Sequence, residues 1–535
     1  MPAPSPSDPR STGEAITASA PEPAPRTRTD QPRMGRLFRG LEAVERVGNL
    51  LPHPFWLFWV LAAILGVISA ILAAAGVEVI LPGTDETVAV KSLLSVEGAV
   101  MAVDSAMENF AGFAPLPVVV SVIIGVAVAE RSGVLDALLR LTIVRLPARW
   151  VTFAVAFTAM ISHVMFDASF IVLLPLAALA FKAVGRSPVL GIVVAYASIS
   201  AGYNASPLVT PSDAIISSLT TTAAQIVDAD YVVTPLANYF WAIASSVILA
   251  ITVTLVVELV LAKRPGLDSD VDPATVEEDA RLELTAVEKK GLLAASTTLF
   301  VLALVIVAIL APTNSPFRGE DGGIVDSVIL ANIAVVIGFA FMLVGIVYGR
   351  ITRTIPNLRA VPDAMAGGMG TLAPVLVLFF AISQFLAYFK WTGIGSVLAV
   401  GGADVLRGSG MPPLVILLAI IVLVSGLNFI VTSGSAMWSI LAPVLVPMLM
   451  YIDIPPETTQ LVFRIADSCT NAVTPMSGYF VLALGMMQRY RKDAGIGTFM
   501  SFTIPLAFTM LAVWVALFIV WYLLGLPIGP GVGIR

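Results

Sequence analysis

The chain has 535 residues, of which 58% are hydrophobic and only 12% are charged. Soluble domains carry about 25% charged residues, so this composition excludes an ordinary soluble protein and indicates a polytopic helical protein in a lipid bilayer. One cysteine, Cys469, and two histidines exclude an intramolecular disulfide and a cysteine- or histidine-rich metal site. We expect no metal and no other cofactor, and we expect no nucleic-acid partner.

The N-terminal region precedes the apolar part of the chain. Residues 1–34 are rich in Pro, Ser, Ala and Thr, a composition typical of a disordered tail. Residues 35–53 place apolar side chains at helical spacing, which predicts an amphipathic helix on the cytoplasmic membrane surface. No cleavable signal peptide pattern comes before the first apolar run, which starts near Pro54.

Apolar runs of about 20 residues predict membrane-spanning helices. Nine such runs occur, at 54–76, 115–130, 187–216, 234–262, 289–312, 327–348, 371–389, 458–488 and 495–524. Two of them, 187–216 and 458–488, contain polar residues and a proline, so we expect each of these two to be a broken helix.

Two further apolar stretches, 148–183 and 411–450, are too long for a single span, and each has a polar break in its middle. The first break includes His163 and Asp167, and the second runs from Asn428 to Trp438. Irregular backbone at membrane depth is tolerated only inside protein or beside water. We therefore predict an all-α polytopic membrane protein with nine transmembrane helices and two re-entrant helical hairpins.

The basic residues are distributed as this topology requires. With a cytoplasmic N-terminus, seventeen Lys and Arg residues between positions 131 and 492 fall in inside loops. Five fall outside, at Lys91, Arg318, Lys390, Arg407 and Arg535. Cytoplasmic loops of membrane proteins carry an excess of Lys and Arg, so the count favours this orientation.

The chain repeats itself on either side of an acidic cytoplasmic linker at 263–288, which joins a first half at 54–262 to a second half at 289–535. Three motifs recur at similar offsets. Ala114-Pro115 recurs 259 residues later as Ala373-Pro374, and Asp167 to Pro175 matches Ser435 to Pro443 at an offset of 268. Asn204-Ala205 recurs 267 residues later as Asn471-Ala472. Five spans separate corresponding elements, so the repeats are inverted. Interrupted segments at corresponding positions of two halves predict a transport site.

The densest polar stretch at membrane depth is Arg464-Ile-Ala-Asp467-Ser-Cys-Thr-Asn471-Ala-Val-Thr-Pro475-Met-Ser477. Polar groups at that depth are expensive and usually mark a transport path. The alternative is a kinked helix whose polar groups satisfy one another, and we favour the functional site. We place Asn471, Pro475 and the corresponding Asn204 at a substrate-binding site.

Arg464 and Asp467 are three residues apart and share a helix face. Either they form a buried pair that neutralises itself, or Arg464 holds a substrate carboxylate in a forked contact while Asp467 orients it or exchanges a proton. Both arrangements can hold at different stages of a transport cycle.

Asp213 lies in the first broken helix, just after Pro211, which we give a structural or gating role. No basic residue lies within one helical turn of Asp213, so we expect it to be the proton carrier and Asp467 to position the arginine. The alternative for Asp213 is a helix-capping role. His163 is interpreted as a structural residue, and Asp167 as a cap or a hairpin contact.

The tip of the second hairpin offers small residues and an aromatic ring. Ser433, Gly434 and Ser435 would let the backbone approach a ligand or an ion. Trp438 either presents an aromatic face to a ring-bearing substrate or packs in the protein interior. We place all four residues at the substrate-binding site.

At these residues the chain resembles the p-aminobenzoyl-glutamate transporter (AbgT) family, from about Leu51 to Pro530. The motifs that carry the resemblance include Glu108-Asn-Phe-Ala-Gly-Phe-Ala-Pro115, Val128-Ala-Glu130-Arg-Ser-Gly133, Ser435-Ala-Met-Trp438 and the Arg464 stretch. Met437 and Thr432 depart from the family pattern, which usually has Lys and Gly there.

The resemblance implies a homodimer in the bacterial cytoplasmic membrane, with nine spans and two hairpins per subunit. It implies transport of p-aminobenzoyl-glutamate and efflux of sulfonamides, driven by the proton gradient. The family's functional positions fall on Asp213, Ser435, Trp438, Pro456, Arg464, Asp467 and Pro475, and we give Pro456 a structural or gating role.

We therefore expect a proton-coupled secondary transporter of aromatic, anionic, folate-related compounds, and not an enzyme. A sodium-coupled dicarboxylate transporter is the alternative, because inverted hairpin repeats suit that use as well. An intramembrane enzyme is the alternative from another class, but the sequence has no zinc-protease His pair to support it. It also has no P-loop, which argues against ATP-driven pumping.

Overall fold

The computed structural model describes residues 54–82, 87–143, 147–165, 168–264, 283–319, 322–324, 327–431, 433–474 and 477–535. All of these belong to one compact unit, Glu45–Arg535, and a second unit, Met1–Val44, lies outside them. The predicted tail at 1–34, the amphipathic helix at 35–53, most of the acidic linker, Asp167 and Pro475 are outside the described residues.

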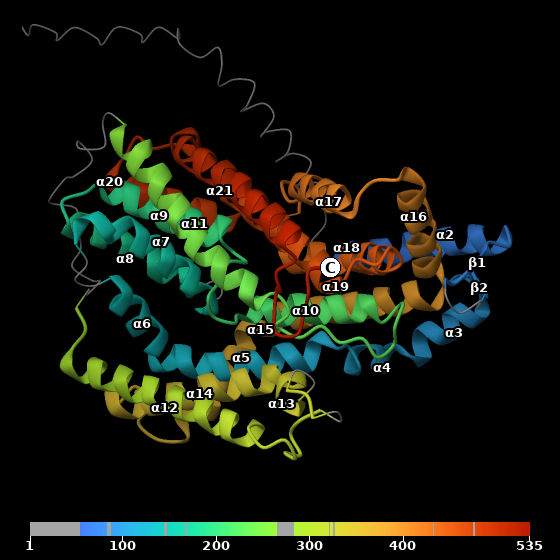
Figure 1. Ribbon diagram of the computed structural model, residues 1–535, viewed down its shortest axis with the longest axis horizontal. Helices are drawn as coiled ribbons and strands as arrows, with labels where there is room; N and C mark the ends of the chain where they lie inside the picture. Colours follow the sequence, from blue (N-terminus) through green and yellow to red (C-terminus); the bar gives the residue numbers. More distant parts are fainter. Residues whose placement is uncertain are drawn as a thin grey trace, which may run out of the picture. The chain divides into compact units, whose positions relative to one another are not determined.

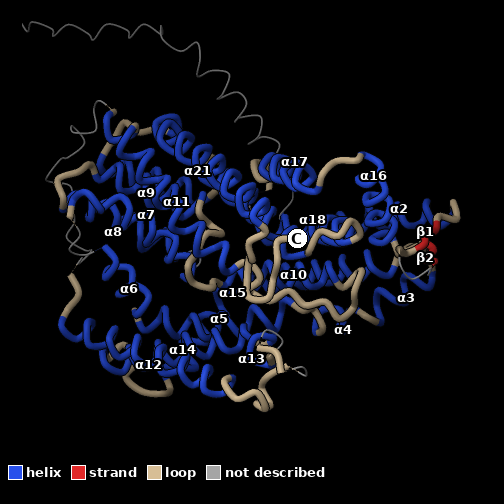
Figure 2. The backbone as a smooth tube through the Cα atoms, viewed as in Figure 1, coloured by secondary structure: helices blue, strands red, loops and turns tan. Residues whose placement is uncertain are grey.

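The described chain is almost entirely helical (Figure 2). Eight helices are long and apolar enough to cross a membrane: Pro54–Ala74, Pro115–Ser132, Ala148–Met165, Tyr239–Lys263, Ala286–Leu310, Ile333–Thr352, Ala360–Trp391 and Ile496–Leu524. Seven of them coincide with predicted spans. The two other predicted spans, 187–216 and 458–488, are the ones expected to be broken, and their pieces are shorter.

Both broken helices are interrupted where the sequence predicted. The first consists of α9 (Pro188–Ala201) and α10 (Pro211–Ala224). The second consists of α19 (Pro456–Cys469), a short turn η6 (Thr470–Ala472) and α20 (Gly478–Tyr490). Pro211 and Pro456 occupy the first turns of α10 and α19, where the missing backbone N–H costs nothing.

Helix α10 continues to Ala224, eight residues beyond the predicted end at 216. The prediction stopped there because Ser217, Ser218 and Thr220 to Thr222 interrupt the apolar run. In the structure these hydroxyls donate to carbonyls of the preceding turn, as Ser218 does to Ala214 O at 2.6 Å and Thr222 to Ser218 O at 3.0 Å. The polar groups are therefore satisfied within the helix.

The two stretches predicted to be hairpins are each divided into helices. The first contains α7 (Val151–Ser162), the turn η2 (His163–Met165) and α8 (Ala168–Ala183). The second contains α17 (Pro413–Leu427) and α18 (Gly434–Met450). Helix α8 packs on α9, whereas α17 and α18 both pack on α19 and α18 also packs on α10.

Several small elements were not predicted from the sequence. Two short antiparallel strands, β1 (Glu78–Ile80) and β2 (Thr87–Ala89), pair with Val79 opposite Val88. Helices α3 (Val96–Asp104), α4 (Ala106–Ala111), α6 (Val134–Ile143) and α16 (Ile394–Ser409) are short or mixed in polarity. None has the length of a membrane span, so a search for apolar runs does not find them.

Three long helices lie side by side: α5 (Pro115–Ser132), α12 (Ala286–Leu310) and α14 (Ile333–Thr352) (Figure 1). Helix α14 packs against both of the others. The backbones of α5 and α14 approach closely at glycines. A Cβ added to Gly338 would lie 2.1 Å from the backbone oxygen of Ser121. Small residues at helix contacts allow this approach, which is how helices pack inside a membrane.

We expect Gly338→Ala to destabilise the protein by about 1–3 kcal/mol, because the new methyl group must push α5 and α14 apart. Thermal unfolding of the purified protein in detergent measures this. Gly367→Ala is the matched control, since a Cβ at Gly367, in α15 (Ala360–Trp391), would meet nothing within 4 Å. Equal melting temperatures for both variants would contradict the close contact.

Candidate functional site

The breaks of the two interrupted helices are in direct contact. Asn204 Nδ2, in the first break, donates to Ser468 Oγ at 2.9 Å and to Arg464 O at 3.4 Å. Cys469 Sγ lies 3.6 Å from Ala201 O. Two segments more than 250 residues apart in the sequence therefore form one buried polar cluster.

The tips of both hairpin stretches reach this cluster. His163, at the first tip, is buried, and its Nε2 lies 2.9 Å from Ile199 O in α9. Asn428, at the second tip, is fully buried, and its Nδ2 contacts Asp467 O at 2.6 Å and Asn471 Oδ1 at 3.1 Å. The bonds to Ile199 O and Asp467 O occupy backbone carbonyls near the helix breaks, where intrahelical partners are lacking.

Arg464 is buried and forms an ion pair with the partly buried Asp213, between the guanidinium Nη2 and the carboxylate Oδ1. The other oxygen of Asp213, Oδ2, accepts bonds from Thr210 N at 2.6 Å and from Thr210 Oγ1 at 2.8 Å. Thr210 and Asp213 thus form a capping box that starts α10. A single carboxylate begins one broken helix and ties it to the other.

This pairing corrects two sequence predictions. The expected partner of Arg464 was Asp467, and Asp213 was expected to have no basic neighbour. Both expectations considered only residues within a helical turn on the same helix. The actual partner of Arg464 comes from another helix, 251 residues away. The capping role, which was the alternative for Asp213, is present.

Asp467 is completely buried, and neither of its carboxylate oxygens has a hydrogen-bond partner among the described residues. The Asn204 side chain lies close to this carboxylate but outside hydrogen-bond geometry, and the charge of Arg464 acts on it from the same helix. Its carboxylate lies against the tip of the second hairpin, where a Cβ on Gly434 would be 2.4 Å from Oδ2. Glycine is therefore the residue that the packing of this carboxylate requires at position 434.

Further oxygens in the cluster also lack partners in the described part of the chain. They are Asn428 Oδ1 and Thr474 Oγ1, and both residues are fully buried. The Nε of Arg464 is an unused donor in the same cluster. Buried polar atoms without partners cost about 1–3 kcal/mol each, so their concentration here makes this cluster the candidate site.

Trp438 packs in the interior instead of facing an open space. Its ring stacks on Phe463 with a centroid distance of 4.4 Å, and it is fully buried. Its Nε1 donates to Thr220 Oγ1 at 2.9 Å. Of the two possibilities that the sequence left, packing holds in this structure. The neighbouring Ser433, Gly434 and Ser435 are half-buried at the start of α18.

Several polar residues of this region were not chosen from the sequence. A chain of hydrogen bonds continues from Trp438 through Thr220 Oγ1 to Gln460 Oε1 at 2.7 Å. Gln460 Nε2 then donates to Asn238 Oδ1 at 2.8 Å, and Asn238 Nδ2 donates to Glu457 O at 3.0 Å. A search for polar residues inside predicted spans finds Gln460 and Asn238, which lies in the predicted span 234–262, but Thr220 lies four residues beyond the predicted end at 216.

We expect Arg464→Gln to lower the free energy of unfolding by about 3 kcal/mol, because it leaves the partly buried Asp213 carboxylate without its counter-charge. The double variant Arg464→Gln with Asp213→Asn should recover part of that loss. Unfolding in detergent measures both. Arg407→Gln is the control, since its pair with Asp404 is exposed and should contribute little. A double variant no more stable than Arg464→Gln would argue against the pair.

Sequence and structure comparisons agree with this architecture. A profile of the AbgT putative transporter family matches residues 39–535. The p-aminobenzoyl-glutamate transport protein of Escherichia coli (strain K12) is 36% identical over 493 residues, which cover 91% of this chain and 96% of that protein.

Two solved structures are similar over their whole length. The YdaH transporter of Alcanivorax borkumensis, described as having an unusual topology, superimposes with a TM-score of 0.82 at 37% identity and covers 90% of this chain. MtrF of Neisseria gonorrhoeae, described as illuminating a class of antimetabolite efflux pumps, gives a TM-score of 0.85 at 38% identity over 92% of this chain. These relatives are transporters and not enzymes, and the chain belongs to the AbgT transporter family.

Proposed function

We propose that this protein is a proton-coupled secondary transporter of aromatic, anionic, folate-related compounds, with p-aminobenzoyl-glutamate as substrate and sulfonamide antimetabolites as exported drugs. The observation that carries the proposal is the buried carboxylate of Asp467, without a hydrogen-bond partner among the described residues, beside the Arg464–Asp213 pair. The relatives supply the substrate class through their descriptions.

Arg464 is the proposed contact for the substrate carboxylate. Its guanidinium uses Nη2 for Asp213, while its Nε has no partner in the described residues. A planar guanidinium can hold a carboxylate with two parallel hydrogen bonds. An arriving carboxylate would compete with Asp213 for Arg464, so substrate binding and the link between α10 and α19 would be coupled. Ser433 to Ser435, Trp438, Asn204, Asn471 and Pro475 complete the proposed site.

Asp467 is the proposed proton carrier. A buried carboxylate is costly unless it is paired, protonated or bound to a cation, and no described residue donates a hydrogen bond to it. Asp213, in contrast, already has a cap and a counter-charge. We therefore move the coupling role from Asp213, where the sequence placed it, to Asp467. Loading a proton there would make the Asp467 carboxyl group neutral, and releasing the proton would leave a charged carboxylate without a partner.

Sodium coupling is the second candidate, and one observation favours it. Asp467 and Asn428 both present buried oxygens without partners in the described residues, and carboxylate and carbonyl oxygens are the ligands that hard cations prefer. The two candidates differ in which gradient drives transport, and this can be measured.

The finer architecture is also part of the proposal. We propose nine transmembrane helices and two re-entrant hairpins in inverted repeats, a homodimer, and a cytoplasmic N-terminus in the bacterial inner membrane. Corresponding contacts in the two halves support the repeat, since α7 and α8 both pack on α9 as α17 and α18 both pack on α19. The excess of basic residues in the predicted inside loops supports the orientation.

We expect Asp467→Asn to retain exchange of p-aminobenzoyl-glutamate between the two sides of a vesicle and to lose the response to an imposed pH gradient. The amide mimics a protonated carboxylate that cannot release its proton. Flux into proteoliposomes with a pH or a sodium gradient measures this. Asp493→Asn, at a surface residue, is the control. A variant that still follows the pH gradient would rule out Asp467, and a wild-type protein that follows only sodium would establish the second candidate.

Arg464→Lys should not restore the substrate binding that Arg464→Ala abolishes, because an ammonium lacks the planar fork. Binding of p-aminobenzoyl-glutamate to the purified variants measures this, with melting temperatures to confirm that each is folded. Full binding by a folded Arg464→Ala protein would contradict the role of the arginine.

A further inference from the structure

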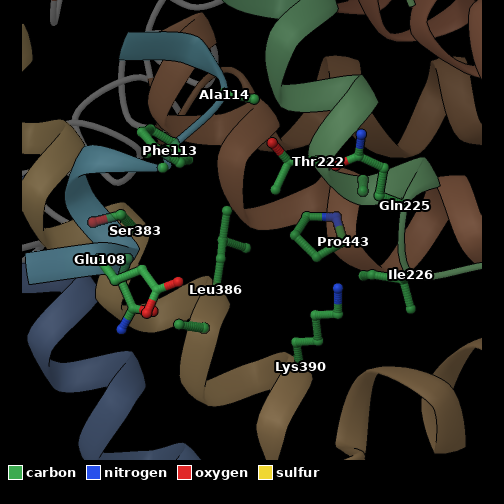
Figure 3. Close-up of a pocket in the computed structure, with 14 residues that line it drawn as sticks. Glu108, Phe113, Ala114, Thr222, Gln225, Ile226, Ser383, Leu386, Lys390 and Pro443 are labelled. Carbon is green, nitrogen blue, oxygen red and sulfur yellow. The ribbon is translucent and has the colours of Figure 1, made fainter. Parts of the chain in front are cut away.

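A pocket of about 330 Å³ lies between two pairs of helices, away from the candidate site. Residues of α4 and α15 form one wall, and the end of α10 with Pro443 of α18 forms the other (Figure 3). Its volume is within the range of small-molecule sites, about 300–1,000 Å³. No residue that the sequence assigned to substrate or proton binding lines it.

Two opposite charges line this pocket. Glu108 comes from α4 and Lys390 from the end of α15, and both side chains reach into the same hollow (Figure 3). Within the described residues neither forms an ion pair, and neither side chain has a hydrogen-bond partner. Each is therefore free to bind a group of a ligand, Lys390 an acid and Glu108 a hydrogen-bond donor.

The wall that carries both charges is held in place by hydrogen bonds. Asn109 Nδ2 donates to Gln384 Oε1 at 3.1 Å, and Gln384 Nε2 donates to Ala106 O at 2.9 Å. These two bonds fix α4 against α15. The helices that carry Glu108 and Lys390 are therefore held at a fixed separation. A preorganised pocket of this kind can select a ligand by the distance between its two charged or polar groups.

The remaining lining is mostly apolar. Phe113 and Leu386 lie on one side, and Ile226 and Pro443 on the other (Figure 3). An apolar centre with an acid-binding group and an amine-binding group fits an aromatic compound that carries an amino group at one end and acid groups at the other. A compound with an acid group at each end fits less well, because Glu108 would repel the acid that lies beside it.

We propose that this pocket is a second binding site for the transported compound, in which Glu108 accepts a hydrogen bond from the aromatic amine and Lys390 binds the acid end. This inference deepens the proposed function and rests on its substrate class. Helix α10 connects the two sites, since Asp213 is near its start and the pocket residue Thr222 is nine residues later. That separation corresponds to about 14 Å along the helix.

Protection from chemical labelling tests the site without any need for transport. The chain has one cysteine, Cys469, so Thr222→Cys in a Cys469→Ala background places a single reactive thiol in the pocket wall. Three probes are compared as protectants against a maleimide: p-aminobenzoyl-glutamate, benzoyl-glutamate without the amine, and sulfanilamide without the carboxylates. We expect p-aminobenzoyl-glutamate to protect at the lowest concentration.

The two charges should separate the probes. Lys390→Met should raise the protecting concentration of both glutamate compounds roughly threefold to tenfold and leave sulfanilamide unchanged, because only the glutamate compounds carry an acid. Glu108→Leu should raise the protecting concentration of the two compounds with an aromatic amine, p-aminobenzoyl-glutamate and sulfanilamide, and leave that of benzoyl-glutamate unchanged. Lys390→Arg keeps the positive charge and Glu108→Gln keeps a hydrogen-bond acceptor. Both variants should therefore be protected at the same probe concentrations as the parent. Lys91→Met is the control for a lysine that does not line the pocket.

Two outcomes would overturn the inference. One is the absence of protection by all three probes in a protein that transports p-aminobenzoyl-glutamate, which would leave the proposed function intact. The other is a Lys390→Met variant that shifts all three probes equally. Protection with the expected pattern in a protein that shows no flux would support the pocket and overturn the transport proposal instead.

Discussion

The ion pair between Arg464 and Asp213 is the interaction on which the centre of this protein depends. Asp213 uses one oxygen to begin α10 and the other to bind α19, so the two broken helices share a single carboxylate. Burying two charges is repaid only when geometry and additional hydrogen bonds are good, and the capping bonds from Thr210 supply them. The same arrangement leaves Asp467, one turn further along α19, without a counter-charge of its own.

What the sequence predicted correctly was local in origin. The apolar runs located seven long helices, and the proline and polar positions located both helix breaks, because these features act through neighbouring residues. The end of α10 was misplaced for an equally local reason. Hydroxyl side chains that bond to their own helix look like polar interruptions in a composition window, although they need no outside partner.

What the sequence could not predict was mostly tertiary. The helical-neighbour rule paired Arg464 with Asp467, but the fold brought in a carboxylate from another helix. Trp438 could have faced a ligand or the interior, and only its contacts with Phe463 and Thr220 distinguish the two. In the sequence, Glu108 belonged to a family motif and Lys390 was one of the charges in a predicted outside loop. Nothing connected the two, because they line one pocket only once α4 packs on α15.

The hydroxyl-rich character of α10 has a mechanical consequence. A helix whose polar side chains bond to its own carbonyls can slide within low-dielectric surroundings without breaking hydrogen bonds to its neighbours. Three residues are exceptions. Ser212 Oγ shares a hydrogen bond with Tyr203 Oη at 2.8 Å, Thr220 also bonds Gln460 and Trp438, and Thr221 accepts from Val233 N at 2.9 Å. These three residues and Asp213 make the side-chain hydrogen bonds and the ion pair that join α10 to its neighbours, so the polar restraint on α10 is concentrated at four side chains.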